Sequence, residues 1–152
     1  MRNANIPESG FTAGPCLLKD TMQLSSFYNH RFKLGHAAMS VNEGIPEFII
    51  TKLQKRFNLK KKTVGVLGLT FKAETDDIRD SLAIKLVKLL KYKKIKTFQS
   101  DEFYKNSENI SKKNLIKKCD IIILATPHKA YKRLKINKSK TLIDIWGLIE
   151  NR

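Results

Sequence analysis

The fold of this chain is decided by residues 120–125, which read DIIILA. A continuous run of isoleucine and leucine is typical of a strand that is buried on both faces of a parallel sheet. Two further apolar runs lie on either side of it in the sequence, TVGVLG at residues 63–68 and TLIDIW at residues 141–146. We therefore expect these three runs to be strands of one sheet whose two faces are both covered.

Helical patterns fill the intervals between the strands. Residues 81–92 carry four leucines on one face, which is the spacing of an amphipathic helix. The remaining expected elements are a strand at 95–98 and helices at 111–118 and 129–134. Strands that alternate with helices at this spacing form βαβ units. The sequence thus predicts an α/β domain over residues 61–150, a parallel sheet with helices on both faces.

A long helical segment is expected before this domain. Residues 19–57 show a helical pattern with a break near residues 29–31. The apolar face of its second part consists of Ile45, Phe48, Ile49 and Leu53. Gly44 and Pro46 weaken the pattern in the middle, so we expect a kink or a restart there.

The composition limits the classes of function. Thirty lysine and arginine residues against 14 acidic ones give a formal net charge of +16, which could serve nucleic acid or an anionic membrane surface. The lysines are scattered through helical patterns, however, and no aromatic residues are interleaved with them as a base-stacking surface requires. We therefore interpret the charge as a lysine-rich solvated surface and expect neither nucleic acid nor a membrane as partner. A basic nucleic-acid-binding protein remains the alternative.

Other simple classes find no support in the sequence. No apolar run reaches the length of a membrane-spanning helix, and the first residues lack the apolar segment of a signal peptide. The two cysteines make no disulfide framework, and no cysteine and histidine cluster has the spacing of metal ligands. We expect a cytoplasmic protein without a bound metal, in which Cys119, at the edge of a buried strand, is structural.

A candidate nucleophile lies in residues 10–20, which read GFTAGPCLLKD. Gly10 and Gly14 allow backbone conformations that let a turn approach a ligand closely. Cys16 is a nucleophile as its thiolate, a form that a nearby cation such as Lys19 favours, and Asp20 could hold or activate a water. The alternative is a glycine loop before a helix, with Cys16 as a small apolar residue.

A candidate ligand site lies in residues 68–81, which read GLTFKAETDDIRDS. This segment follows the first strand, at the edge of the sheet where α/β proteins bind ligands. It has no G-x-G-x-x-G fingerprint of dinucleotide binding. It offers Phe71 as an apolar wall, Lys72 as a cation and Arg79 at the start of a helix, groups that suit a diphosphate. The residues expected to cap that helix are Asp76, Asp77 and Asp80.

Together the two segments resemble the UDP-glucose/GDP-mannose dehydrogenase family. The first is similar to the family's catalytic-cysteine motif, and the second to its signature G-x-x-F-K-x-x-T-x-D-x-R-x-S, about 50 residues further on. The resemblance implies a Rossmann-like parallel sheet with helices on both faces, preceded by a long helical segment. It divides the chain into a catalytic-cysteine loop at 1–18, a central dimerisation helix region at 19–58 and a nucleotide-sugar (UDP)-binding domain at 61–150.

The resemblance also implies a chemistry. Members of the family oxidise the C6 hydroxyl of a nucleotide sugar to a carboxylate and reduce two NAD molecules. Cys16 matches the nucleophile that forms a thiohemiacetal and then a thioester, and Asp20 matches the acid that assists the water and proton transfers. Lys19 and Arg79 match residues that approach NAD. The matches to the UDP-sugar contacts are Phe71 and Lys72, with Phe11 through Gly14 as the turn under the sugar.

The similarity covers only the second half of such an enzyme. The NAD-binding domain is not in this chain, so we expect the chain alone to be inactive, or to act with a partner that supplies that half. A homodimer through the central helix is the other expected assembly. Two further hypotheses remain open, a UDP-sugar-binding module without catalysis and a basic nucleic-acid-binding protein with a Rossmann-like core.

Overall fold

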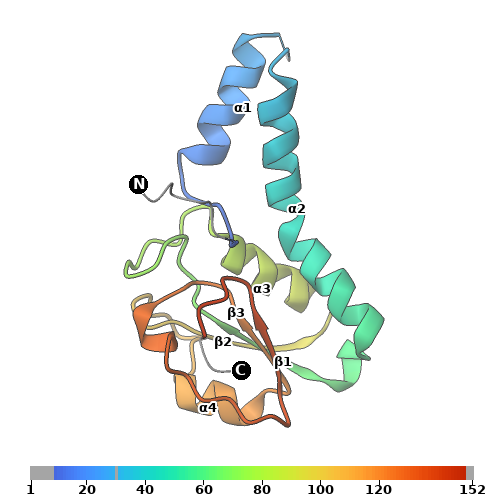
Figure 1. Ribbon diagram of the computed structural model, residues 1–152, viewed down its shortest axis with the longest axis vertical. Coiled ribbons are helices and arrows are strands. Elements are labelled where there is room, and N and C mark those ends of the chain that lie inside the picture. Colours follow the sequence, from blue (N-terminus) through green and yellow to red (C-terminus); the bar gives the residue numbers. More distant parts are fainter. Residues whose placement is uncertain (1–8, 30, 150–152) are drawn as a thin grey trace, which may run out of the picture.

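One parallel sheet organises the computed structural model, which describes residues 9–29 and 31–149 (Figure 1). Its strands are β1 (Thr63–Leu67), β2 (Lys96–Ser100), β3 (Ile121–Leu124) and β4 (Thr141–Asp144). Their order is β2-β1-β3-β4, and every pair of neighbours is parallel. The chain leaves β1 toward β2 on one side and then crosses to β3 on the other. The expected parallel sheet is confirmed, and a topological switch point lies between β1 and β3.

Helices cover both faces of the sheet, as the apolar runs predicted. On one face, side chains of β1 and β3 pack against α2 (Lys33–Arg56) and α3 (Leu82–Tyr92). On the other, they pack against α4 (Lys112–Lys118). Successive strand residues point to opposite faces, so Val66 joins the first cluster and Leu67 the second. Burial on both sides explains why residues 121–124 are apolar without interruption.

Gly65 brings α4 close to β1. A Cβ atom on this residue would lie 2.5 Å from Leu115 Cδ2 and 2.8 Å from Cys119 Sγ. Leu115 and Cys119 fill that space instead and are almost fully buried. The expectation that Cys119 is structural agrees with this position.

A helical hairpin extends from the sheet domain (Figure 1). It consists of α1 (Leu17–Phe27) and α2, and the second half of α2 continues onto the sheet domain and packs beside α3. Of the two expected alternatives, a kink or a restart, the restart is wrong, because α2 runs unbroken through Gly44 and Pro46. Figure 1 shows the helix changing direction about halfway along, as a kink would. Proline removes one backbone hydrogen bond from a helix. Here the helix stays continuous while Pro46, Ile50 and Leu53 bury one of its faces.

The element boundaries differ from the expected ones by a few residues. Helix α1 begins at Leu17, so the last two residues of the expected cysteine loop are helical. Strand β2 extends to Ser100, and the helix expected at 129–134 is a 3₁₀ turn, Lys129–Tyr131. A second 3₁₀ turn, Leu59–Lys61, joins α2 to β1. Among the described helices, none is both long enough and apolar enough to span a bilayer.

Candidate functional site

Cys16 lies at the exposed N-terminal end of α1, as a free thiol. Its carbonyl oxygen accepts a hydrogen bond of 2.8 Å from the amide of Asp20, which closes the first helical turn. The side chains of Lys19 and Asp20 form an ion pair of 3.1 Å, and both are well exposed. The Asp20 carboxylate raises the pKa of Lys19, first through their hydrogen bond and then through its charge. The negative charge that Cys16 carries as a thiolate acts on Lys19 in the same direction.

Two aromatic rings and one amide hold the loop before Cys16. Gly10 lies against the ring of Trp146, and Gly14 lies against Phe71, where a Cβ atom would be 3.2 Å from the ring. Both glycines have positive φ angles, +155° and +132°, which disfavour other residues. The carbonyl oxygen of Thr12 accepts a hydrogen bond of 2.6 Å from the side chain of Asn42. The loop is therefore fixed between the end of β4, the β1–α3 turn and α2.

Phe11 takes a different position from its neighbours in this loop. Its side chain is 5% exposed and belongs to the apolar cluster on the α2 and α3 face of the sheet. The ring therefore anchors the loop in the core. The role of Phe11 in a sugar site stays a prediction, and it concerns the backbone of the residue, because the ring is buried.

The β1–α3 turn holds Arg79 through Asp77. The Arg79 guanidinium donates hydrogen bonds of 2.6–3.1 Å to both carboxylate oxygens of Asp77, and its amide donates to one of them at 2.9 Å. The hydrogen bonds to Arg79 lower the pKa of Asp77, and those to Asp77 raise the pKa of Arg79. A smaller part of the rise at Arg79 comes from the charge of Cys16. The contact between Gly14 and Phe71 brings the two sequence motifs together, and the charge of a Cys16 thiolate would favour the protonated forms of both Lys19 and Arg79.

The expected helix capping by Asp76, Asp77 and Asp80 is wrong. Ser81 is the N-cap of α3, and its hydroxyl accepts from the amide of Ile84 at 3.4 Å and donates to the Leu69 carbonyl at 2.6 Å. The carboxylate of Asp77 instead pairs with the guanidinium of Arg79, which offers it two parallel donors. Arg79 therefore lies two residues before the N-cap, in the turn.

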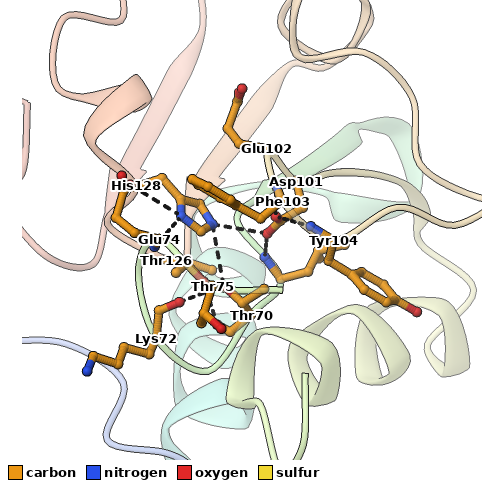
Figure 2. A network of polar contacts seen from close by, with 12 residues as sticks. Thr70, Lys72, Glu74, Thr75, Asp101, Glu102, Phe103, Tyr104, Thr126 and His128 are labelled. Carbon is orange, nitrogen blue, oxygen red and sulfur yellow. Dashed lines mark hydrogen bonds and ion pairs between the residues drawn. The ribbon is translucent and has the colours of Figure 1, made fainter. Parts of the chain in front are cut away.

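Phe71 and Lys72 are neighbours in the same turn but differ in exposure. Phe71 is half-buried under Gly14, and its amide donates to the Asp77 carbonyl at 3.0 Å. Lys72 is exposed, and its ammonium points away from the polar network at the strand ends (Figure 2). Its carbonyl oxygen accepts a hydrogen bond of 2.8 Å from the hydroxyl of Thr70.

A buried polar network lies beneath this turn, and the sequence motifs did not indicate it (Figure 2). Asp101 follows β2, and its carboxylate accepts from the amides of Leu69, Phe103 and Tyr104 at 2.5–2.9 Å. His128 follows β3, and its Nε2 lies 3.2 Å from the same carboxylate. Burial opposes the charge on Asp101, yet the hydrogen bonds from His128 and the three amides outweigh it and lower the pKa of this carboxyl.

No signal in the sequence could have found these partners. The aspartate and the histidine are 27 residues apart, and each stands after its strand as an ordinary polar residue. Asn42 and Trp146 are similar, because a contact across 30 residues leaves no local pattern. Within the described ranges, no group of three or more histidine, cysteine, aspartate or glutamate side chains could hold a metal ion.

Comparisons with known proteins show the family to which the chain belongs. Residues 65–151 match the model of the UDP-glucose/GDP-mannose dehydrogenase family, UDP binding domain. The chain is 32% identical to UDP-glucose 6-dehydrogenase of Rickettsia felis over 160 residues, which cover 91% of this chain and 36% of that protein. It is 31% identical to UDP-N-acetyl-D-mannosamine dehydrogenase of Pyrococcus horikoshii over 148 residues, 90% and 35% of the two chains.

A solved structure gives the same picture. UDP-D-ManNAc dehydrogenase of Pyrococcus horikoshii superposes with a TM-score of 0.82 and 28% identity, over 97% of this chain and 38% of that one. The chain thus spans little more than a third of the length of the relatives it matches. It belongs to the UDP-glucose/GDP-mannose dehydrogenase family and contains that family's UDP-binding domain.

Proposed function

We propose that this chain supplies the UDP-sugar site and the nucleophilic cysteine of an NAD-dependent UDP-sugar 6-dehydrogenase of the UDP-glucose type. The observation that carries the proposal is the meeting of Cys16 with the β1–α3 turn, through the contact of Gly14 with Phe71 and the electrostatic interaction of Cys16 with Arg79. Several relatives are named UDP-glucose 6-dehydrogenase, and that name supports the choice of sugar.

The substrate would lie along the turn. Phe71 offers an apolar wall, and Lys72 offers an exposed ammonium for the diphosphate. Gly14 leaves the backbone open to close approach, and Phe11 anchors the loop that passes under the sugar. In this arrangement the C6 carbon of the sugar would lie near the exposed thiol of Cys16.

In the chemistry we propose for this site, Cys16 is bonded to the substrate carbon in two successive intermediates. After the C6 alcohol has been oxidised to the aldehyde, the thiolate adds to the carbonyl carbon and gives a thiohemiacetal. Loss of a hydride from that carbon gives a thioester, and a water molecule hydrolyses it to the carboxylate and frees the thiol. Asp20, one helical turn after Cys16, exchanges protons with the alkoxide and the water.

The residues suit a dinucleotide only in part. Lys19 and Arg79 place two cations beside Cys16, which fits the diphosphate of NAD, and NAD would supply the acceptor for both hydrides. The sequence has no G-x-G-x-x-G segment, and the chain covers 36% of the length of a related dehydrogenase. We therefore assign the main NAD-binding half to residues other than these 152, in a longer polypeptide or in a partner. This chain by itself should produce no NADH from UDP-glucose.

The hairpin is proposed as the surface for a second copy of the chain. Large apolar side chains on α1 and α2 are exposed, and the most exposed are Phe27 (79%), Leu34 (81%), Val41 (73%) and Phe48 (59%). An apolar surface of this kind is unusual on a monomer. Static light scattering should show a dimer, and a monomer at high protein concentration would contradict this assembly.

Calorimetric titration with UDP-glucose and with UDP tests the proposal directly. Loss of a hydrogen bond to a charged group costs about 1.5–3 kcal/mol, so Lys72→Ala should bind UDP about 10- to 100-fold more weakly. Lys96→Ala is the matched control, because Lys96 is also exposed but begins β2 at the opposite edge of the sheet. No binding by the wild type at millimolar ligand would refute the proposed site. Affinity for DNA or RNA with a steep salt dependence would then favour the basic-protein hypothesis.

A further inference from the structure

The network under the β1–α3 turn connects the ends of three strands (Figure 2). Asp101 follows β2, His128 follows β3, and Thr70 and Glu74 lie in the turn after β1. The imidazole of His128 is fully buried, and the rings of Phe103 and Tyr131 lie 5.0 and 5.4 Å from it. A buried polar group of this kind adopts the arrangement that its hydrogen bonds define.

The hydrogen bonds define one tautomer of His128. The amide of Glu74 donates to Nδ1 at 3.0 Å, so Nδ1 carries a lone pair and no proton. The ring proton is therefore on Nε2, which donates to Asp101 at 3.2 Å. The carboxylate of Asp101 is also held by the amide of Leu69 at 2.5 Å, so it does not turn away from the ring. His128 thus bridges Asp101 and the turn, accepting at Nδ1 and donating at Nε2.

The turn needs this support at Glu74. Its φ angle is +58°, a left-handed conformation that costs a residue other than glycine about 1–2 kcal/mol. Two contacts oppose that cost, the bond from its amide to His128 and the bond of 2.9 Å from the Lys129 amide to its carboxylate. The preceding residues are fixed as well, because Thr126 donates to the Thr70 carbonyl at 2.8 Å.

We propose that His128 is a positioning residue for the UDP-sugar site. Through Nδ1 it sets the conformation of Glu74, and so the direction of the backbone that carries Phe71 and Lys72. This inference deepens the proposed function and rests on it for the ligand. The group that does the positioning is the unprotonated Nδ1; the bond from Nε2 to Asp101 fixes the ring.

Two substitutions separate the two nitrogens of the ring. His128→Asn puts an amide oxygen close to the place of Nδ1 and gives up the bond to Asp101. His128→Gln carries its amide further out, close to the place of Nε2, and leaves the Glu74 amide without an acceptor. The asparagine variant loses the buried contacts of Nε2, with Asp101 and with the Thr70 hydroxyl at 3.4 Å, and the glutamine variant loses the contact of Nδ1. A purely structural role therefore predicts that the asparagine variant is no better than the glutamine variant in stability or ligand affinity. Positioning through Nδ1 predicts that the asparagine variant keeps UDP binding far better.

The first measurements use the protein without ligand. Nitrogen NMR of the wild-type imidazole should show an unprotonated Nδ1 and a protonated Nε2. Hydrogen exchange should show protected amides over residues 70–75, with the protection kept in His128→Asn and lost in His128→Gln. An Nδ1-protonated ring in the wild type would overturn the inference even if neither variant folded. Equal protection of the turn in both variants would overturn it as well.

Titration with UDP then completes the test. A net hydrogen bond contributes about 1 kcal/mol, so His128→Gln should bind UDP about fivefold more weakly than His128→Asn. Equal affinities of the two variants would overturn the positioning role. If the wild type binds no UDP while the exchange pattern depends on Nδ1 as described, the proposed ligand is wrong and the control of the turn by His128 stands.

Discussion

Replacement of Asp101 by asparagine should strongly destabilise the fold. The carboxylate receives four hydrogen bonds, from the amides of Leu69, Phe103 and Tyr104 and from His128. One oxygen accepts from Phe103 and Tyr104, and an asparagine oxygen can take over both bonds. The asparagine NH₂ then stands where the other oxygen was, and it faces two N–H donors.

The size of the effect follows from those two donors. A buried donor that loses its acceptor costs about 1–3 kcal/mol, so the amide of Leu69 and the ring of His128 together cost about 2–6 kcal/mol. A whole domain is stable by only about 5–15 kcal/mol. Urea denaturation followed by circular dichroism should therefore show a much lower midpoint for Asp101→Asn. A loss below about 1 kcal/mol would refute the assigned hydrogen-bond directions.

Asp120→Asn is the matched control for this experiment. Its carboxylate accepts one amide bond of 2.8 Å from Thr63, and its side chain is 47% exposed. Water can replace the lost interaction there, so the free energy of unfolding should change by no more than about 1 kcal/mol. A large loss of stability in Asp120→Asn would show that aspartate-to-asparagine substitution is itself destabilising, and the loss in Asp101→Asn could then not be assigned to burial.

The same carboxylate predicts a response to acid. Its pKa is lowered in the folded protein from the usual value of 3.8, so its contribution is complete above about pH 4 and is lost as the pH falls through the lowered pKa. The free energy of unfolding of the wild type should therefore decline below pH 4 more steeply than that of Asp101→Asn. Parallel pH profiles would contradict the lowered pKa.

Two further outcomes test the core and the thiols. Gly65→Ala should destabilise the fold by about 1–3 kcal/mol, because the added Cβ would contact α4. Gly44→Ala is the control: its Cβ would meet open space within a helix, so the substitution should stabilise the fold by about 0.5–1 kcal/mol. Thermal melts compare the two, and a neutral Gly65→Ala would show that α4 packs less closely than described. Iodoacetamide at neutral pH should alkylate Cys16 and spare Cys119, whose burial raises the pKa of its thiol to about 11. Mass spectrometry of peptides measures this, and early modification of Cys119 would contradict its burial.

The sequence predicted the sheet because its strands carry local patterns. Residues 121–124 are apolar on both faces, and that pattern alone indicated a central parallel strand. The family was likewise predicted from two short motifs, and the comparisons confirmed it. The roles of Cys16, Asp20 and Lys72 remain predictions.

What the sequence did not indicate depends on contacts between distant residues. An aspartate such as Asp77 favours helix capping in general, but a nearby arginine competes for it, and geometry decides the outcome. Asp101 directly follows the mostly polar strand β2, and His128 lies four residues after the end of β3, so neither residue belongs to a local pattern. These strand ends lie side by side only because β2, β1 and β3 are neighbours in a parallel sheet. The network therefore depends on the strand order, which a local sequence pattern does not contain.

The proline in α2 has a mechanical consequence. Pro46 has no N–H, so the carbonyl of Asn42, one turn earlier, receives no hydrogen bond from it and the helix is least stiff at this turn. The side chain of Asn42 is also the group that holds Thr12 in the loop before Cys16. A force applied to the far end of the hairpin would therefore bend α2 at the turn whose side chain holds the loop before Cys16. Bending of the helix and displacement of the thiol would in that way be coupled.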